Sequence, residues 1–140
     1  QGLASWYMYF FQLPRVPEWS MKWRNGAMMS KLLQQAGQTP AAAARDAQAM
    51  LEPGALTAAI NWYRALPLSS PGSINQKISV PTLYVWSDQD IALMPQSAYD
   101  TGRYVTGEYR FEIMPGVSHW IPDEQPDKLA ELLLEWFAAH

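Results

Sequence analysis

The sequence has 140 residues, of which 49% are hydrophobic, no cysteine and a formal net charge of −3. This composition is typical of a folded, soluble domain, and its charge excludes the basic surface that nucleic-acid binding needs. The longest apolar run, Trp6 to Phe11, is far shorter than the ~20 residues that span a bilayer, and the absence of cysteine excludes a disulfide, a thiolate nucleophile and a cysteine-ligated zinc.

The chain begins with Gln1-Gly2, without an initiator Met or a signal-peptide pattern. We therefore expect a piece of a longer protein, with a cytoplasmic location and no membrane partner. Lysine and arginine outnumber aspartate and glutamate by seven to three from Gln1 to Lys77, whereas acidic residues lead by ten to three from Ile78 to His140. The segment P-L-S-S-P-G-S between these parts is typical of a turn or linker. We expect a helical part over residues 1–68, a linker over 69–77 and an α/β part over 78–140.

The first part contains four helix candidates and no alternating strand pattern. They cover Leu3 to Leu13, Pro17 to Gln35, Ala41 to Leu51, and the segment from Pro53 to Pro67. Thr39 and Pro40 are favourable residues for the N-cap and first turn of the third helix. In the fourth helix, apolar residues recur at the spacing of one helical face. These patterns predict a small helical layer.

The second part alternates strands with helices. Pro81 to Trp86 is a short β-branched and aromatic run, which favours a strand buried on both faces. A helix is predicted from Pro95 to about Val105, a second strand from Tyr109 to Met114, and a last helix from Pro126. The last helix carries an apolar stripe that includes Leu129, Leu132, Leu133, Trp136 and Phe137. This order predicts an α/β fold with parallel strands and a right-handed crossover, in a sheet that further strands must complete.

Two titratable residues follow the predicted strands. Asp90 lies after the first strand in W-S-D-Q-D, and His119 lies after the second in G-V-S-H-W. Adjacent strands are about 5 Å apart, so residues just beyond their carboxyl ends can reach hydrogen-bond distance. An aspartate that orients a histidine is the acid–base part of a catalytic triad. Spacing alone leaves open that Asp90 is a turn residue and His119 an ordinary loop histidine.

These segments resemble the C-terminal end of an α/β-hydrolase, namely V-P-T-L-Y-V-W-S-D-Q-D, G-V-S-H-W and the final P-D-E-Q-P-D-K-L-A-E-L-L-L-E-W-F. That family carries its catalytic acid after the penultimate strand, usually in G-x-x-D, and its histidine after the last strand. Ser87 replaces the glycine here, Asp90 matches the acid, and Asp88 is the competing candidate. The resemblance implies the C-terminal part of an α/β-hydrolase fold, with a helical cap followed by β-α-β-α.

The helical part resembles the lid of epoxide hydrolases. In G-A-L-T-A-A-I-N-W-Y-R-A the lid tyrosine maps onto Tyr63, and S-W-Y-M-Y-F-F-Q-L-P-R-V-P-E is similar to the first lid segment, which maps the second tyrosine onto Tyr7. Tyr9 lies two residues further on and competes with Tyr7. The resemblance implies that residues 1–68 are the cap and that the two tyrosines polarise an epoxide oxygen. Three tryptophans flank these positions and His119, and are pocket-wall candidates or ordinary core residues: Trp6, Trp62 and Trp120.

A nucleophile elbow is absent from the sequence. The elbow needs two glycines in G-x-Nuc-x-G, and no two of the eight glycines are four positions apart. The resemblance therefore implies an epoxide-hydrolase-like enzyme whose aspartate nucleophile lies outside this sequence, acting on a small apolar epoxide or ester with no cofactor and no metal. We expect the isolated chain to be inactive, and a missing N-terminal core half or a second copy to complete its sheet.

Three alternatives remain at this point. A serine at the missing elbow would make the protein an esterase or lactonase, whereas a haloalkane dehalogenase is less favoured because it has no use for the lid tyrosine. The third alternative is a non-catalytic module that assembles through its open sheet edge.

Overall fold

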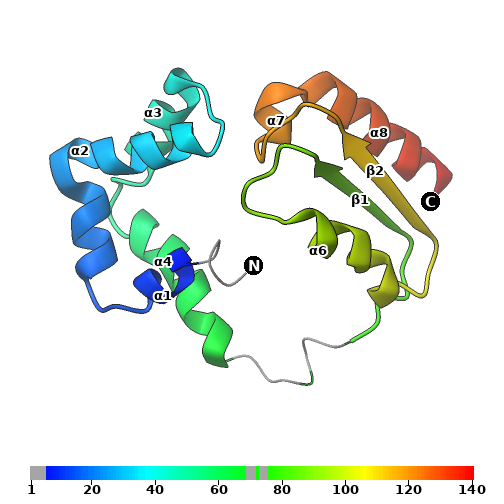
Figure 1. Ribbon diagram of the computed structural model, residues 1–140, viewed down its shortest axis with the longest axis horizontal. Helices are drawn as coiled ribbons and strands as arrows, with labels where there is room; N and C mark the ends of the chain where they lie inside the picture. The colour runs from blue at the N-terminus through cyan, green and yellow to red at the C-terminus, as the bar shows by residue number, and fades with distance from the viewer. Residues whose placement is uncertain (1–5, 69–71, 73–75) are drawn as a thin grey trace. The chain divides into compact units, whose positions relative to one another are not determined.

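The computed structural model describes residues 6–68, 72 and 76–140, and the chain divides into two compact units, Gln1–Ser70 and Pro71–His140 (Figure 1). Most of the predicted linker, residues 69–77, lies outside the described residues, as does the start of the predicted Leu3 to Leu13 helix. Each unit has its own core. No helix in the described ranges is long and apolar enough to cross a membrane.

The first unit is helical, as predicted. Its elements are α1 (Trp6–Phe11), α2 (Val16–Gln35), α3 (Pro40–Ala49), α4 (Ala55–Ala65) and a short 3-10 turn, η1 (Leu66–Leu68). The predicted N-cap of α3 is present, because the Thr39 hydroxyl accepts a hydrogen bond from the backbone N–H of Ala42 at 3.2 Å. The core of this unit consists of Met21, Met29, Ala47, Leu56 and Ile60.

One continuous helix from Pro17 to Gln35 was predicted, and this is wrong. The backbone leaves helical geometry at Trp23, and Arg24, Asn25 and Gly26 have positive φ angles of 50°, 57° and 77°. A positive φ costs a glycine little, so Gly26 suits the bend best. The bend turns the second half of α2 against α3, where the buried Gly26 faces the side chain of Ala47.

The second unit is a β-α-β-α arrangement with parallel strands, as predicted. Its elements are β1 (Thr82–Ser87), α6 (Pro95–Asp100), a 3-10 turn η2 (Thr101–Tyr104), β2 (Tyr109–Met114), α7 (Ile121–Glu124) and α8 (Pro126–Ala139). β1 and β2 pair in parallel from Thr82↔Tyr109 to Ser87↔Met114. The helix that begins at Pro95 ends earlier than predicted, since it tightens into η2 at Thr101.

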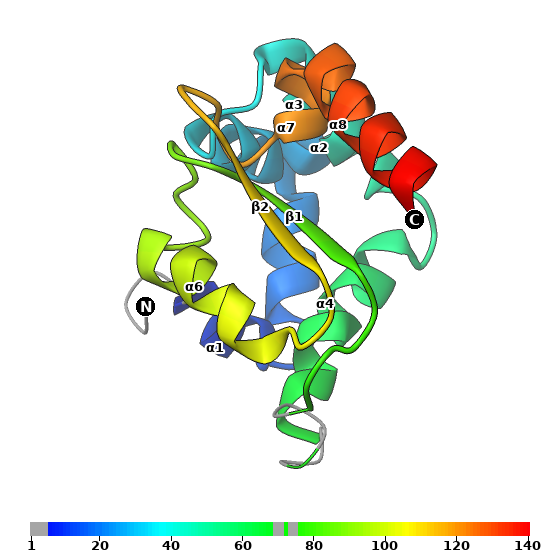
Figure 2. The same cartoon turned by 90° about the vertical axis from the view of Figure 1, so that its right-hand side faces the viewer.

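The helices α6 and α8 cover opposite faces of the strand pair (Figure 2). On one face, Leu132 of α8 packs with Met114 and Val117, against Leu83 and Val85 of β1. On the other face, Tyr99 of α6 contacts Trp86 and Phe111, at ring-centroid distances of 6.0 and 5.9 Å. This alternation of side chains is the period-two pattern of a strand with both faces covered.

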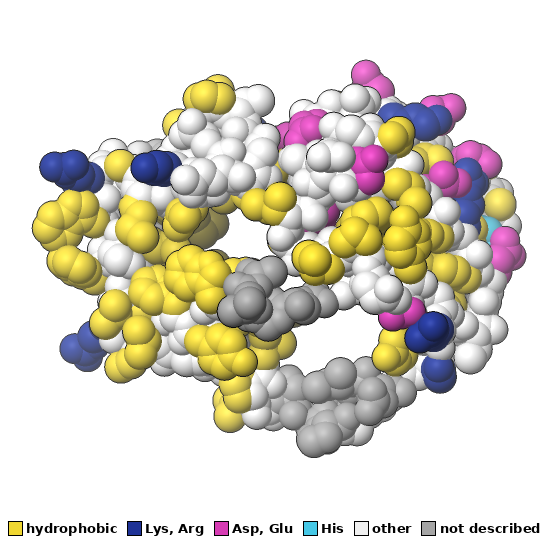
Figure 3. Space-filling model, viewed as in Figure 1, with side chains coloured by type: hydrophobic (Ala, Val, Ile, Leu, Met, Phe, Trp, Pro, Cys, Tyr) yellow, Lys and Arg dark blue, Asp and Glu magenta, His cyan; other side chains and the backbone are white. Residues whose placement is uncertain are grey.

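Burial of the strands is less complete than predicted. Only Trp86 and Ser87 of β1 are buried, and the other four residues are half-buried. Within the described residues the sheet has two strands, which pair only with each other. The predicted stripe of α8 is also only partly covered: Leu132 and Trp136 are buried, whereas Phe137 is 69% exposed. Figure 3 shows further exposed hydrophobic side chains over the helical unit. The exposed residues of this unit include Trp19, Trp23 and Trp62.

Candidate active site

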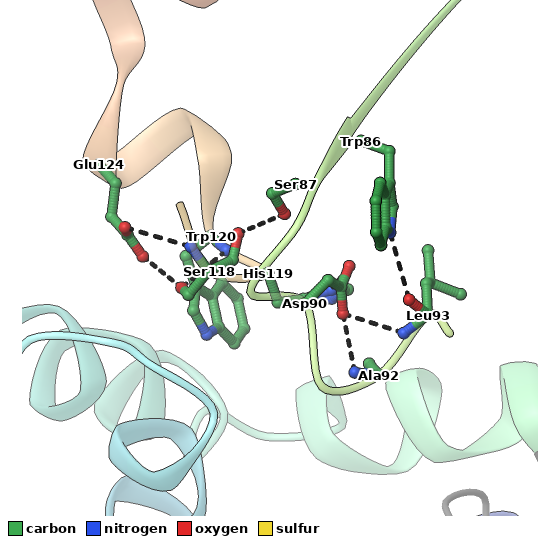
Figure 4. Close-up of polar contacts among 9 residues, drawn as sticks. All are labelled: Trp86, Ser87, Asp90, Ala92, Leu93, Ser118, His119, Trp120 and Glu124. Carbon is green, nitrogen blue, oxygen red and sulfur yellow. Dashed lines mark hydrogen bonds and ion pairs between the residues drawn. The ribbon is translucent and has the colours of Figure 1, made fainter. Parts of the chain in front are cut away.

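Asp90 and His119 meet at the carboxyl ends of the two strands (Figure 4). Asp90 lies in the loop after β1, and His119 lies in the loop between β2 and α7. Nδ1 of His119 is 2.9 Å from Oδ2 of Asp90, so the predicted contact is present. Parallel pairing brings both loops to the same edge of the sheet, which explains how residues 29 positions apart come together.

The carboxylate of Asp90 is held from two directions. Its Oδ1 accepts hydrogen bonds from the backbone N–H groups of Ala92 and Leu93, at 2.7 and 2.9 Å. Its Oδ2 is left to face the imidazole, and the side chain is only 4% exposed. The indole N–H of Trp86 donates to the carbonyl of Leu93 at 3.2 Å, which ties the same loop back to β1. Asp90 is therefore both a turn residue and the partner of His119.

The imidazole of His119 is oriented but accessible. An ionised carboxylate can only accept, so the contact with Asp90 requires the proton on Nδ1. Within the described residues Nε2 makes no hydrogen bond, and the side chain is 37% exposed. The ring of Trp120 lies edge-on to the imidazole, with centroids 5.3 Å apart. This tautomer leaves Nε2 as a lone-pair base, which is the arrangement that proton abstraction needs.

Asp88, the competing acid, has a different partner. Its Oδ1 accepts a hydrogen bond from the backbone N–H of Gly116 at 2.7 Å. Gly116 is the second residue of the loop that carries His119 and has a positive φ of 73°. Asp88 thus fixes the start of the histidine loop, while Asp90 contacts the histidine itself. The geometry favours Asp90 as the acid of the pair.

The two loops are joined by further contacts that the sequence did not indicate. The backbone N–H of Gln89 donates to the carbonyl of Val117 at 3.1 Å, and the hydroxyl of Ser87 donates to the carbonyl of Ser118 at 2.6 Å. Glu124 accepts hydrogen bonds from Ser118. The position of Glu124 five residues after His119 was visible in the sequence, but its partner depends on α7, which is too short to show a helical period.

The predicted lid tyrosines lie together in the first unit. The rings of Tyr7 in α1 and Tyr63 in α4 meet edge to face, with centroids 5.7 Å apart, and Phe11 contacts both. Tyr9, the competitor of Tyr7, is 76% exposed. The structure therefore brings Tyr63 together with Tyr7, whereas Asp90 and His119 form their pair in the other unit.

Arg64, the residue after Tyr63, holds α4 to the end of α1 and the start of α2. Its guanidinium donates to the carbonyls of Phe11 and Leu13, at 2.9 and 2.8 Å, and to both carboxylate oxygens of Glu18, at 2.7 and 3.1 Å. The Gln12 amide also donates to the carbonyl of Tyr63, at 3.0 Å. The sequence showed Arg64 within N-W-Y-R, but nothing in the sequence identified Glu18 as its partner. These contacts hold the last turn of α4, which carries Tyr63, against the end of α1, the helix that carries Tyr7.

The pocket-wall candidates lie in different environments. Trp6 is 57% exposed and Trp62 is 76% exposed, whereas Trp120 is half-buried beside His119. Their part in a pocket stays a prediction. Among the described residues, no three His, Cys, Asp or Glu side chains gather in a group that could hold a metal ion.

Comparison with known proteins agrees with this architecture. The AB hydrolase superfamily protein YfhM of Bacillus subtilis is 34% identical over 143 residues, which cover 97% of this chain and 49% of YfhM. Mouse epoxide hydrolase 3 is 30% identical over 139 residues, which cover 95% of this chain and 38% of the mouse protein. The chain thus spans about half the length, or less, of these curated relatives. No protein-family model matches the sequence.

A solved structure shows the same fold. Cfl2 of Burkholderia cenocepacia superposes with a TM-score of 0.79 at 23% identity, over 97% of this chain and 48% of Cfl2. The relatives, the shared fold and the parallel strand pair all lead to one assignment. The chain belongs to the α/β-hydrolase superfamily, in its epoxide-hydrolase-like branch, and corresponds to the C-terminal portion of that fold.

Proposed function

We propose that this chain supplies the acid–base pair and the cap tyrosines of an epoxide hydrolase. The observation that carries the proposal is the hydrogen bond between Nδ1 of His119 and Oδ2 of Asp90, 2.9 Å long, which leaves Nε2 without a partner in the described residues. The names of the relatives, among them mouse epoxide hydrolase 3, support the choice of substrate class. The substrate is a small apolar epoxide.

The reaction has two steps. In the first, an aspartate carboxylate from an elbow outside this sequence attacks an epoxide carbon, the C–O bond of the ring breaks, and an ester forms. In the second, Nε2 of His119 removes a proton from water, and the hydroxide adds to the ester carbonyl carbon. Collapse of that adduct releases the diol and restores the carboxylate. Asp90 stabilises the imidazolium that forms on His119 in this step.

Residues 1–68 form the cap in this proposal, and Tyr7 with Tyr63 donates hydrogen bonds to the epoxide oxygen. Ring opening places negative charge on that oxygen, and a phenol both stabilises the charge and supplies the proton that converts the alkoxide to a hydroxyl. The phenolate then takes a proton from solvent, to which the imidazolium of His119 releases the proton that it removed from water. The 5.7 Å ring contact between the tyrosines supports a shared role. Trp6, Trp62 and Trp120 supply apolar wall around the substrate.

An ester or lactone hydrolase is the alternative, because the same pair would activate a serine at the elbow. The proposal also requires further strands beside β1 and β2, from an N-terminal core half or from a second copy. Two observations support that requirement. Residues Thr82–Val85 of β1 are only half-buried, and within the described residues β1 and β2 pair only with each other. A module without catalytic activity would need the same partner but would show no turnover.

The test uses a protein in which residues upstream in the same reading frame extend this chain to include an elbow. We expect it to hydrolyse a small epoxide such as styrene oxide, and the 140-residue chain alone to show no turnover. In the extended protein, His119→Ala should accumulate a covalent adduct whose mass equals enzyme plus epoxide, because the histidine is needed only for the second step. Glu131→Ala, at an exposed site on α8, is the matched control and should turn over normally.

Two results would contradict the proposal. A serine hydrolase needs His119 to form its covalent intermediate, so a His119→Ala variant that forms no adduct, in a protein that cleaves p-nitrophenyl esters, would establish the alternative. Absence of any turnover in the extended, folded protein would favour the non-catalytic module.

A further inference from the structure

Ser118 is the residue before His119, and each of its polar groups makes a hydrogen bond (Figure 4). Its backbone N–H donates to Oε2 of Glu124 at 3.3 Å, and its hydroxyl donates to Oε1 of the same carboxylate. Its hydroxyl oxygen accepts a hydrogen bond from the backbone N–H of Trp120 at 3.3 Å. Its carbonyl accepts from the hydroxyl of Ser87 at 2.6 Å. The loop is therefore tied on both sides of the histidine.

Ser87 provides the contact from β1. It is the last residue of the strand and is 1% exposed. It also stands where the family pattern described above has a glycine, and a glycine has no hydroxyl to donate. The hydrogen bond to Ser118 thus depends on the residue by which this sequence departs from that pattern. Removing the hydroxyl would leave the carbonyl of Ser118 without this partner.

Glu124 provides the contact from α7. This short helix starts directly after Trp120, and the backbone N–H groups of Asp123 and Glu124 both donate to the Trp120 carbonyl at 3.0 Å. The turn sends the Glu124 carboxylate back toward Ser118, where it accepts two hydrogen bonds. Charge-assisted hydrogen bonds of this kind are about twice as strong as neutral ones.

We propose that Ser87 and Glu124 are positioning residues for His119, acting through Ser118. The imidazole can meet Oδ2 of Asp90 only while the backbone at residues 118 and 119 keeps its place, and these two side chains hold that backbone from β1 and from α7. Asp90 is itself fixed by two backbone N–H groups. Both partners of the pair are then preorganised, which lets Nε2 act without rearrangement. That this positioning serves catalysis rests on the proposed function.

The experiment reads the imidazole directly. The chain has only two histidines, His119 and His140, so ¹⁵N-histidine NMR resolves both rings. In the wild type, with the ring neutral, we expect His119 to be mainly the Nδ1–H tautomer with slow exchange of that proton. Ser87→Ala and Glu124→Ala should each raise the exchange rate by roughly fivefold, the effect of losing a hydrogen bond of about 1 kcal/mol, and shift the ring toward the Nε2–H tautomer.

The control and rescue variants separate positioning from general stability. Ser87→Thr keeps the hydroxyl and should restore the wild-type tautomer, and Glu131→Ala removes an exposed carboxylate on α8 without effect on His119. An unchanged tautomer and exchange rate in Glu124→Ala, with a wild-type circular dichroism spectrum, would overturn the proposal. Glu124 is exposed, so this variant decides the question even if Ser87→Ala fails to fold.

The readout is independent of turnover. A wild-type Nδ1–H tautomer that both substitutions disturb, in a chain whose extended form hydrolyses neither epoxides nor esters, would refute the proposed function and leave the positioning intact. Hydrolysis of epoxides together with an imidazole that neither substitution disturbs would refute the positioning alone.

Discussion

The guanidinium of Arg64 and the carboxylate of Glu18 form a two-point ion pair, with N–O distances of 2.7 and 3.1 Å. The two side chains are only 24% and 16% exposed. Because Arg64 also donates to the carbonyls of Phe11 and Leu13, one side chain joins the end of α1, the start of α2 and the last turn of α4.

Arg64→Met should therefore destabilise the helical unit by about 2 kcal/mol, because it leaves a half-buried carboxylate and two carbonyls without their donor. Urea unfolding followed by circular dichroism at 222 nm measures the change. Arg45→Met is the matched control, since the Arg45 side chain in its ion pair with Asp46 is 62% exposed, and we expect a loss below about 0.5 kcal/mol. Equal losses in the two variants would contradict the structural role of Arg64.

Glu18 should make this unit sensitive to acid. The hydrogen bond from Arg64 lowers the pKa of Glu18 below its ordinary value of 4.5. A carboxyl whose pKa is lower in the folded state stabilises the fold above the unfolded pKa, and this contribution is lost as the pH falls through the folded pKa. We expect the free energy of unfolding to decline below pH 4.5, and Glu18→Gln to flatten that decline. A parallel decline in the variant would show that other groups are responsible.

His140 should make the stability of the fold depend on pH in the opposite direction. Its ring stacks on Trp136 with centroids 3.9 Å apart, Nδ1 lies 2.9 Å from the Trp136 carbonyl, and Nε2 lies 3.2 Å from the Glu108 carboxylate. The hydrogen bond to the Trp136 carbonyl, followed by that to Glu108, raises the pKa of His140 above its ordinary 6.5. The charged ring therefore stabilises the fold below pH 6.5, and the contribution is lost as the pH rises through the higher folded pKa.

Glu108→Gln tests this relationship. It should lower the pKa of His140 in a ¹H-NMR titration and reduce the loss of stability between pH 6 and 8. An unshifted titration of His140 would show that the contact with Glu108 does not contribute to the pKa of His140 in solution.

Gly107 permits a close crossing of two backbone segments. A Cβ at this position would lie 2.5 Å from the carbonyl oxygen of Ser79 and 2.8 Å from that of Val80. Both are backbone atoms just before β1, so Gly107→Ala should displace the start of the strand pair and cost roughly 2 kcal/mol. Gly54→Ala is a useful comparison. Its Cβ would meet nothing within 4 Å, so only the strain of its positive φ remains, about 1 kcal/mol. Thermal unfolding of both variants ranks the two losses of stability. A larger loss of stability for Gly54→Ala than for Gly107→Ala would contradict this interpretation.

Sequence patterns identified the parts of this fold that local chemistry determines. β2 spans Tyr109–Met114 as predicted, because its β-branched and aromatic residues lie between Thr106-Gly107 and Pro115-Gly116. The bend of α2 was missed because Arg24 and Asn25 have positive φ, a conformation that non-glycine residues keep only where the surrounding structure imposes it. α7, with four residues, is too short to have a recognisable period.

In the candidate site, too, some features could be predicted from the sequence and others depend on tertiary contacts. The order of strands and loops predicted only that Asp90 and His119 could reach each other, and the resemblance to α/β-hydrolases identified them as a pair. The separate roles of Asp88 and Asp90 were not accessible from spacing, because they depend on which loop atoms each carboxylate meets. The hydrogen bond from Ser87 to Ser118 was equally hidden, since the departure from glycine at that position gave no indication of its partner.

Asp88 and Asp90 should differ in their effect on turnover, which is measured in the extended protein that contains an elbow. In Asp90→Asn the amide N–H₂ would face Nδ1 of His119 and impose the wrong tautomer, with the proton on Nε2. We expect kcat for ester-intermediate hydrolysis to fall by roughly 10³- to 10⁴-fold, as in triads that lose their acid. In Asp88→Asn the amide carbonyl can still accept the hydrogen bond from Gly116, so kcat should change by less than about threefold.

The same pair of variants in the 140-residue chain gives a second, turnover-free comparison. Asp90→Asn should abolish the Nδ1–H signal of His119 in ¹⁵N-histidine NMR, whereas Asp88→Asn should preserve it, because Asp88 contacts the backbone of Gly116 and Asp90 contacts the imidazole. If Asp88→Asn removed the signal and the turnover while Asp90→Asn kept both, the acid would be Asp88. The hydrogen bonds of Asp90 to Ala92 and Leu93 would then serve only to shape the loop after β1.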